Sequence, residues 1–153
     1  CNRLKFHVMK LVAAQKRYDR WKMMRSELYG ELSDDFQEAE MKAISKDKEF
    51  RESFIEVVDD VEVGMLEMSL RNFVDGCLSS PVAYIEGIYI NSKLRGQGYG
   101  AKIIDLAKNW AKSKQCIELA SDTEINNTNA QKFHDAVGFK ETYRIVQYKM
   151  TLD

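Results

Sequence analysis

A glycine-rich loop is the feature that most constrains how this chain can fold. The loop reads Arg95-Gly96-Gln97-Gly98-Tyr99-Gly100 and stands between an apolar stretch, Val82 to Ile90, and a segment of helical periodicity that runs to about Lys112. The start of a helix leaves backbone N–H groups unpaired and carries partial positive charge, and glycines let the backbone approach a ligand closely. The order therefore predicts a strand, a diphosphate-binding loop and a helix, with Arg95 adding a charged contact. The alternative is a glycine-rich turn without a ligand.

Two familiar classes of phosphate site fit this loop poorly. A nucleoside-triphosphate loop continues into Gly-Lys-Ser/Thr, whereas Gly100 is followed by Ala101-Lys102-Ile103, which offers no hydroxyl for magnesium. A nicotinamide-binding fold requires an acid some twenty residues after the loop and several further strand–helix units. Glu118 or Asp122 meets the spacing, but only about 50 residues follow the loop. The sequence therefore favours a different coenzyme.

The rest of the chain alternates between helical and strand-like periodicity. Met9 begins a first strand, and apolar spacing with capping residues predicts helices over Asp19–Tyr29, capped by Asp19, and Ser33–Lys46. Before the glycine loop, three further strands are predicted over Ser53–Val58, Glu62–Arg71 and Val82–Ile90. The helix after the loop has an apolar face formed by Ile103, Ile104, Ala107, Trp110 and Ala111. The elements predicted after that helix are a strand over Cys116–Ser121, a helix over Asn127–Val137 and a strand pair over Lys140–Thr151. The predicted fold class is α/β, with a central mixed sheet and about four flanking helices.

Composition narrows the class of protein. A chain of 153 residues fits one domain, and 23 basic against 24 acidic residues give a net charge of −1, so we expect no nucleic-acid partner. The apolar runs are too short to cross a membrane and the first ten residues do not resemble a signal peptide, which indicates an intracellular, cytoplasmic protein. The segment Cys1–Val8 is interpreted as either an extension or a remnant of cloning, and no function is assigned to it. The cysteines, which we expect to be free thiols without a metal, are Cys1, Cys77 and Cys116.

The glycine loop resembles the acyl-CoA signature of the GNAT superfamily of N-acetyltransferases, and Asn127-x-x-Ala130 through Gly138-Phe139 resembles their later helix and turn. The chain is most similar to the aminoglycoside 6'-N-acetyltransferases within it, from about Met9 to the C-terminus. The matching motifs are Trp21-x-x-x-Arg25-x-x-Leu28, Ser69-Leu70-Arg71, Gly76-Cys77, Ser80-Pro81-Val82, Tyr84-Ile85-Glu86-Gly87-Ile88, Ala120-Ser121-Asp122-Thr123 and Gly138-Phe139-x-Glu141-Thr142.

Residue by residue, the resemblance implies a site for acetyl-CoA as co-substrate. The backbone of Ile88, Tyr89 and Ile90 would pair with the pantetheine arm as an added strand, and Asn127 would touch the cofactor. The diphosphate would be held by the loop and the helix start, formed by Arg95, Gly96, Gln97, Gly98, Tyr99, Gly100 and Ala101. The same resemblance implies a 6'-acetylated aminoglycoside, hence antibiotic resistance, and a homodimer, in some relatives formed by exchange of C-terminal strands.

The same resemblance implies that the carboxylates of Glu86 and Asp122 face the amino sugar. A polycationic acceptor suits a cleft with carboxylates, and its amine must lose a proton before it attacks a thioester. Glu86 is the only charge in a strand otherwise fit for burial, although Arg71 or Arg95 could simply pair with it. Asp122 could equally be a turn residue or a helix cap.

Other positions depart from the family pattern. Tyr29 stands where a Trp is common, Phe73 replaces a Tyr and Tyr143 replaces a Glu, all at substrate-facing positions, so the preferred drug is open. The family's thiolate-protonating Tyr corresponds to His134, which on a helix is more often structural. Tyr148 is the alternative acid, set against ordinary strand packing.

Several features are interpreted as structural or left as alternatives. Cys77 and Cys116 have no flanking His, so direct acetyl transfer is preferred to an acyl-cysteine. The acidic run could steer a cation or be a solvated helix face, and it comprises Glu31, Asp34, Asp35, Glu38 and Glu40. The methionines expected in the core are Met23, Met24, Met41, Met65 and Met68. Alternative functions are acetylation of a polyamine or a protein N-terminus, or a binding module of low turnover.

Overall fold

The computed structural model describes residues 8–30 and 32–153. The predicted N-terminal extension therefore lies, except for Val8, outside the described residues, and so does Glu31 of the acidic run. The statements below concern the described part of the chain.

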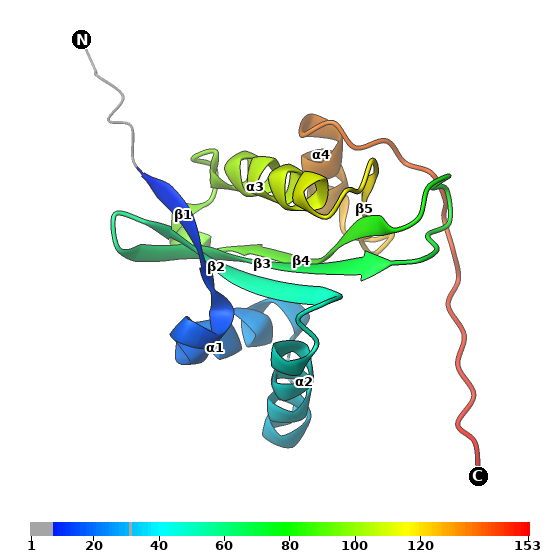
Figure 1. Cartoon of the computed structure of the whole chain (residues 1–153), viewed down its shortest axis with the longest axis horizontal. Coiled ribbons are helices and arrows are strands. Elements are labelled where there is room, and N and C mark those ends of the chain that lie inside the picture. The colour runs from blue at the N-terminus through cyan, green and yellow to red at the C-terminus, as the bar shows by residue number, and fades with distance from the viewer. Residues whose placement is uncertain (1–7, 31) are drawn as a thin grey trace.

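A five-stranded sheet forms the centre of the fold (Figure 1). The first four strands are antiparallel neighbours in chain order, and the fifth runs parallel to the fourth. The strands are β1 (Met9–Ala13), β2 (Arg51–Val58), β3 (Val61–Arg71), β4 (Val82–Ile90) and β5 (Leu119–Ser121). The sheet is therefore mixed, as predicted, and contains each strand predicted before residue 122. The last of these is shorter than predicted, because β5 covers Leu119–Ser121 and not Cys116–Ser121.

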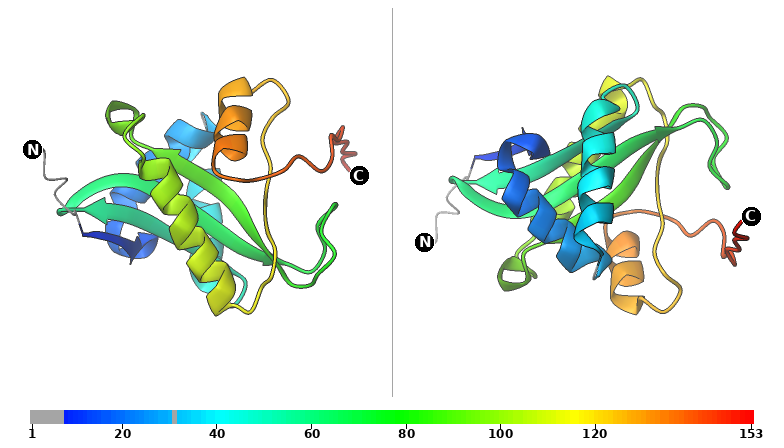
Figure 2. Two further views of the ribbon diagram at one scale, coloured as in Figure 1. Left: turned by 90° about the horizontal axis from the view of Figure 1, so that it is seen from above. Right: turned by 90° about the horizontal axis from the view of Figure 1, so that it is seen from below.

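Helices cover both faces of this sheet (Figures 1 and 2). The helices α1 (Tyr18–Tyr29) and α2 (Asp34–Lys46) lie on one face, and α3 (Tyr99–Ser113) and α4 (Thr128–Ala136) lie on the other. Short 3₁₀ turns occupy Ala14–Arg17 and Ser92–Leu94. The expectation of a mixed sheet flanked by about four helices is confirmed.

Local capping explains where α2 begins. The hydroxyl of Ser33 accepts a hydrogen bond from the backbone N–H of Phe36 at 3.3 Å, and Asp34 and Asp35 lie in the first turn, where the helix dipole favours acids. The prediction that Asp19 caps α1 is wrong. That helix begins one residue earlier because the preceding 3₁₀ turn already curves the chain, and no side chain caps it.

Two apolar clusters hold the layers together. The predicted apolar face of α3 is buried against β3 and β4, with Ile103 and Ala107 fully enclosed. The second cluster joins α1 and α2 to the sheet through residues that include Trp21, Met24, Met41, Ile55 and Met65. Each large side chain enclosed in this way contributes about 1.5–3 kcal/mol. Of the five methionines predicted in the core, Met23 is the exception, because it faces solvent.

The predicted strand pair over 140–151 is wrong. Residues 139–153 form no strand, pass the β3–β4 connection where Thr142 packs against Gly76, and then run away from the sheet (Figures 1 and 2). The strand-forming side chains are present, but a strand needs a hydrogen-bonded neighbour, and two strands alone are marginal in water. The single described chain supplies no such neighbour to this segment.

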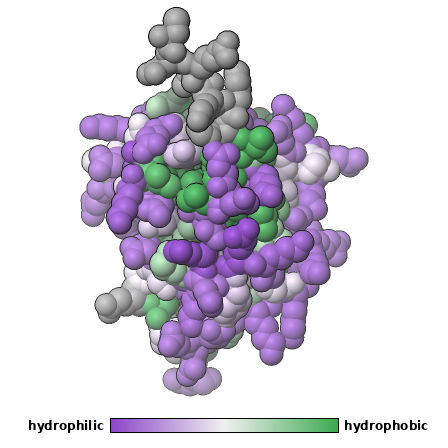
Figure 3. All heavy atoms as spheres, turned by 90° about the vertical axis from the view of Figure 1, so that its left-hand side faces the viewer, coloured by the Kyte–Doolittle hydropathy of each residue, from purple (hydrophilic) through white to green (hydrophobic). Residues whose placement is uncertain are grey.

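The surface agrees with the charged composition of the chain. Seen from the side that carries the β2–β3 turn, the molecule is largely hydrophilic, with apolar side chains gathered in a limited area (Figure 3). Within the described residues, no helix combines the length and apolar character needed to cross a membrane.

Candidate active site

The glycine loop opens α3 as the sequence predicted. Gly98 is the N-cap residue with φ of +85° and Gly96 has φ of +78°, a backbone region that favours glycine. The space where a side chain would stand at either glycine is empty to 4 Å, and no side chain caps the helix. The first amides of α3 therefore face an open position that suits an anion.

The same loop is packed tightly on its other side. A Cβ at Gly100 would lie 2.8 Å from the ring of Phe133, so α4 packs closely on the first turn of α3 and a larger residue would displace that ring. Arg95 donates from Nε to the carbonyl of Ile90 at 3.0 Å and stands over the ring of Tyr89. These contacts fix the loop to the end of β4 and to α4.

Beyond Ile85, the edge of β4 that faces β5 is open. The strand β5 pairs with Ala83, Tyr84 and Ile85 only, whereas β3 pairs with β4 from Val82 to Ile90 except at one residue, Glu86. The polar groups on that edge of Ile88–Ile90 have no strand partner among the described strands. An extended ligand arm can therefore lie against this edge and reach the mouth of α3.

Glu86 occupies a bulge in β4. Glu67 of β3 pairs with Gly87 and the next residue, Met68, pairs with Ile85, so Glu86 has no partner in the register. A bulge re-aims the side chain at that position. It turns Glu86 to the sheet face that carries α1 and α2.

The expectation that Glu86 is buried is wrong in degree, since 31% of its side chain is exposed. Its carboxylate accepts hydrogen bonds from the Ser69 hydroxyl at 2.6 Å and from Arg71, whose Nη2 lies 2.8 and 2.9 Å from the two oxygens and whose Nε lies 3.0 Å from Oε1. Of the two arginines considered from the sequence, Arg71 pairs with Glu86, while Arg95 bonds to Ile90.

Asp122 is connected to Glu86 through two intervening side chains. The hydroxyl of Tyr84 donates a hydrogen bond to Asp122, and the guanidinium of Arg71 lies 3.5 Å from the centre of the Tyr84 ring. Burial raises the pKa of Tyr84, and the bond to Asp122 raises it further. Glu86, Arg71, Tyr84 and Asp122 thus form one continuous row, which we call the acceptor row.

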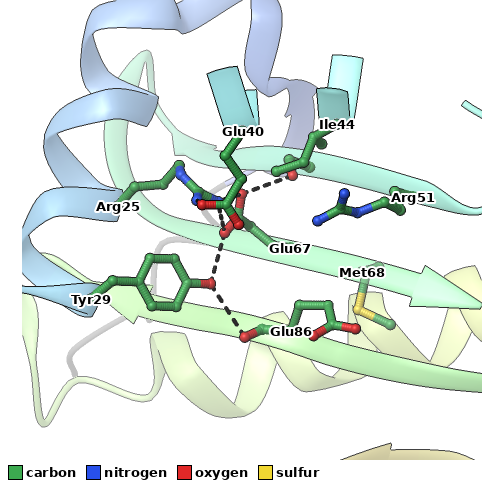
Figure 4. Close-up of a pocket in the computed structure, with 9 residues that line it drawn as sticks. Arg25, Tyr29, Glu40, Ile44, Arg51, Glu67, Met68 and Glu86 are labelled. Carbon is green, nitrogen blue, oxygen red and sulfur yellow. Dashed lines mark hydrogen bonds and ion pairs between the residues drawn. The ribbon is translucent and has the colours of Figure 1, made fainter. Parts of the chain in front are cut away.

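A second, buried network stands beside this row (Figure 4). Arg25 donates from Nη1 to both oxygens of Glu67 at 2.6 and 2.7 Å, and Trp21 and Ser53 donate to the same carboxylate at 3.0 Å. The Tyr29 hydroxyl lies 2.8 Å from Glu67 and 3.2 Å from the backbone carbonyl of Glu86. Burial, and then the Glu67 charge, raise the pKa of Tyr29. The ion pair of Arg25 and Glu67 therefore anchors the bulge.

Between these groups lies a pocket of about 140 Å³. Its lining residues come from α1, α2, β2, β3 and β4, and Figure 4 draws them around the bulge: Arg25, Tyr29, Glu40, Ile44, Arg51, Ser53, Glu67, Met68 and Glu86. Three carboxylates line the pocket together with two arginines. Such a set can hold a cationic amine on a carboxylate while limiting the net negative charge around it.

The other predicted site residues lie outside this pocket. Phe73, Tyr143 and Tyr148 are highly exposed, the last two on the segment after α4, and the described chain does not bring them against Glu86 or Asp122. Asn127 caps α4 by accepting a hydrogen bond from the N–H of Ala130 at 3.0 Å. Their roles toward ligands stay predictions.

His134 and the cysteines have structural environments. The His134 ring lies 2.7 Å through Nδ1 from the carbonyl of Ala130 and 3.0 Å through Nε2 from the hydroxyl of Ser121. Burial raises the pKa of Cys77 and of Cys116, which holds both as thiols and disfavours an acyl-cysteine. Among the described residues, no three His, Cys, Asp or Glu side chains cluster as metal ligands.

The sequence interpretation missed the residues that link the two acids. Arg71 was noted only as a possible partner and within a motif, and Tyr84 and Glu67 received no role. Their signal was the period-two spacing of Glu67, Ser69 and Arg71, which places three polar side chains on one face of a buried strand.

The open edge of β4 leads to a glycine loop that suits a diphosphate, and a charged pocket lies on the same sheet. This arrangement is the one expected of a protein that uses an acyl-coenzyme. Residues 21–139 match the sequence profile of the acetyltransferase (GNAT) family, and the chain belongs to that family.

Several relatives are similar to the chain over most of its length. An aminoglycoside N(6')-acetyltransferase type 1 of Serratia marcescens is 41% identical over 88% of this chain and 92% of its own, and one of Salmonella typhimurium is 37% identical over 86% and 90%. Among solved structures, AAC(6')-Iy in complex with a bisubstrate analogue, CoA-S-monomethyl-acetylneamine, superposes with a TM-score of 0.87 at 32% identity, over 97% of this chain and all of that one.

Proposed function

We propose that this protein transfers the acetyl group of acetyl-CoA to the 6'-amine of an aminoglycoside and thereby confers antibiotic resistance. The observation that carries the proposal is the bulge of β4, where the acidic pocket on one face of the sheet meets the open strand edge that leads to the glycine loop. The similarity to aminoglycoside N(6')-acetyltransferases supports the choice of acceptor. Because acetyl-CoA is an intracellular metabolite, we also propose a cytoplasmic location. We further propose that the chain forms a single catalytic domain.

The residues present fit the coenzyme. The amides at the start of α3 and the empty space before Gly96 and Gly98 suit a diphosphate, and Arg95 brings positive charge to the loop. The unpaired edge of Ile88, Tyr89 and Ile90 suits the amide groups of pantetheine. Gln97, Tyr99, Gly100, Ala101 and Asn127 complete the proposed binding set.

The acceptor occupies the pocket at the bulge. Glu86 and Asp122 bind its ammonium groups, and the ring of Tyr29 offers a face for stacking on a sugar. Phe73 and Tyr143 belong to the proposed acceptor site as well, and they close over the sugar from the loop after β3 and from the segment after α4.

Transfer proceeds by direct attack of the neutral amine on the thioester carbonyl. A backbone N–H near Ile88 stabilises the developing oxyanion, which is worth roughly 3 kcal/mol, and alignment of the two reactants contributes about 7–11 kcal/mol. Glu86 and Asp122 receive the proton or orient the water that does. Tyr148 is proposed to protonate the departing thiolate, for which the C-terminal segment must dock near the site.

A homodimer provides such docking. The side chains that the C-terminal segment exposes are largely apolar, and they include Ile145, Val146, Tyr148, Met150 and Leu152. A segment rich in strand-forming residues gains stability when it pairs with a sheet, and a second copy of this chain offers one. We propose that the segment is exchanged between two copies. Equilibrium sedimentation at a mass near 17.7 kDa would contradict this.

The test of the acceptor uses purified protein, acetyl-CoA and a panel of aminoglycosides, with free thiol as the readout. Thiol release with kanamycin-type acceptors is expected, and no release across the panel would remove the proposed activity. Asp122→Asn is expected to weaken aminoglycoside binding far more than coenzyme binding. The matched control is Asp105→Asn on the exposed side of α3, which should change neither. Equal losses for both ligands in Asp122→Asn would make Asp122 a structural residue.

A further inference from the structure

The acceptor row contains a positive charge, Arg71, next to the carboxylate that is proposed to bind the cationic substrate. Arg71 contacts both carboxylate oxygens of Glu86 and at the same time covers the ring of Tyr84, whose hydroxyl is bonded to Asp122. The pair is solvated, with 41% of the Arg71 side chain and 31% of the Glu86 side chain exposed. A guanidinium in this position neutralises Glu86 before any ligand arrives.

The charged side chains around the bulge come from several elements, and most of them form ion pairs. On the helices, α1 contributes Arg25 and Tyr29 and α2 contributes Glu40, while Arg51 comes from β2 and Glu67 from β3. Arg25 is paired with Glu67 and with Glu40, the latter at 2.7 Å. With Arg71 set against Glu86, the acceptor row itself is left with the charge of Asp122. The row is therefore weakly negative.

This balance matters because the acceptor amine has two opposite requirements. It arrives as an ammonium ion, which carboxylates bind, but it attacks only after it has lost its proton. A carboxylate within ~4–6 Å raises the pKa of an ammonium group, and a nearby cation lowers it, each by about 1–3 units. The partial exposure of Arg71 and Glu86 places the expected shift at the low end of that range. Two uncompensated acids would bind the amine tightly and keep it protonated at neutral pH.

We propose that Arg71 is a positioning residue that holds the Glu86 carboxylate in place and offsets its charge, so that a cationic amine binds at the bulge and can still release its proton. The inference rests on the proposed function, because it concerns the amine that this site acetylates. Arg71 acts through Glu86. The residue therefore sets both the affinity for cationic acceptors and the pH at which they react.

The experiment compares Arg71→Gln with wild type in steady-state kinetics from pH 6 to 9, at saturating acetyl-CoA. In Arg71→Gln the KM for the aminoglycoside is expected to fall several-fold, while kcat at pH 7 falls about tenfold, because a shift of one pKa unit changes the neutral fraction by that factor. The pH midpoint of kcat is expected to rise by about one unit, so that the loss disappears at high pH. Arg17→Gln, which removes an arginine that pairs with Glu62 at 2.7 Å outside the pocket, is the matched control and should leave the midpoint in place.

Two further variants complete the test. Arg71→Lys keeps the charge and should restore the wild-type midpoint, whatever it does to KM. Glu86→Gln leaves the Arg71 charge uncompensated and should move the midpoint downward and raise KM, a result that stands even where Arg71→Gln does not fold. Melting temperature and acetyl-CoA affinity report on folding.

The outcomes separate this inference from the proposed function. A wild-type protein that acetylates no aminoglycoside refutes the proposed function itself. An active wild type whose midpoint stays unchanged in Arg71→Gln and in Glu86→Gln refutes only the role of Arg71. A uniform loss of kcat at every pH in Arg71→Gln would likewise show that Arg71 has only a structural role.

Discussion

Glu56 gives the sharpest prediction about stability. Its side chain is fully buried in β2, on the face that α3 covers, and neither carboxylate oxygen has a hydrogen-bond partner among the described residues. Burial raises the pKa of Glu56 from 4.5 to about 7, against the opposing effect of Lys102 in α3. The folded protein therefore keeps a proton on Glu56 at pH values where the unfolded chain has released it.

The sign and size of the effect follow from this difference. Below about pH 4.5 both states are protonated and Glu56 carries no penalty, whereas between 4.5 and 7 the folded state binds more protons, so its stability falls as pH rises. Above pH 7 the penalty is complete. A shift of 2.5 units at 1.36 kcal/mol per unit amounts to about 3 kcal/mol.

Glu56→Gln keeps the shape of the side chain and removes the ionisation. Urea unfolding of the variant and the wild type at pH 5 and pH 8 measures the effect. A common m value, the slope of the unfolding free energy against urea concentration, is used where the fitted slopes agree. The stability of the variant relative to wild type should increase by roughly 2–3 kcal/mol between the two pH values, a comparison in which other titrating groups cancel.

Glu52→Gln is the control in the same strand. Glu52 is partly exposed and pairs with Lys114 at 3.1 Å, so its removal should destabilise the protein by about 0–1 kcal/mol with little change between the two pH values. If the difference between Glu56→Gln and wild type were the same at pH 5 and pH 8, the argument from burial would be refuted.

Three other predictions concern the site and the assembly. Tyr29→Phe keeps the ring but removes the hydroxyl that lies between Glu67 and the Glu86 carbonyl, so urea unfolding should reveal a loss of about 1–2 kcal/mol; unchanged stability would argue against the anchoring role. Gly98→Val forces a β-branched residue to φ of +85°. Calorimetry should then find that the affinity for acetyl-CoA is reduced at least about tenfold while the affinity for the aminoglycoside is retained. An unchanged affinity for acetyl-CoA would place the diphosphate elsewhere. Deletion of residues 143–153 should turn a sedimenting dimer into a monomer, and a dimer that persists would show that the segment is not exchanged.

The helices and the central strand were predictable because their signals are local. Ser33 with two acids identifies the start of α2, and the apolar positions of α3 repeat at the helical period, so neither depends on the rest of the chain. The stretch Val82–Ile90, apolar apart from Glu86 and Gly87, likewise predicted β4 with its observed bounds.

The bulge and the acceptor row were not predictable in this way. Whether Glu86 is paired or bulged depends on the register between β3 and β4, which is set by long-range contacts. The contact of Arg71 with Tyr84 depends on that register too. Strand propensity alone predicted a strand pair over 140–151, and that prediction was wrong because propensity does not supply the neighbouring strand.

The central claim is that the bulge of β4 presents the 6'-amine of an aminoglycoside to the thioester of acetyl-CoA. Nuclear magnetic resonance of the purified product tests it most directly, because the spectrum assigns the nitrogen that carries the new acetyl group. We expect one acetyl group per aminoglycoside, on the 6'-nitrogen, with one free coenzyme thiol released for each. An acetyl group on a different nitrogen, or coenzyme hydrolysis that leaves the aminoglycoside unmodified, would contradict the claim.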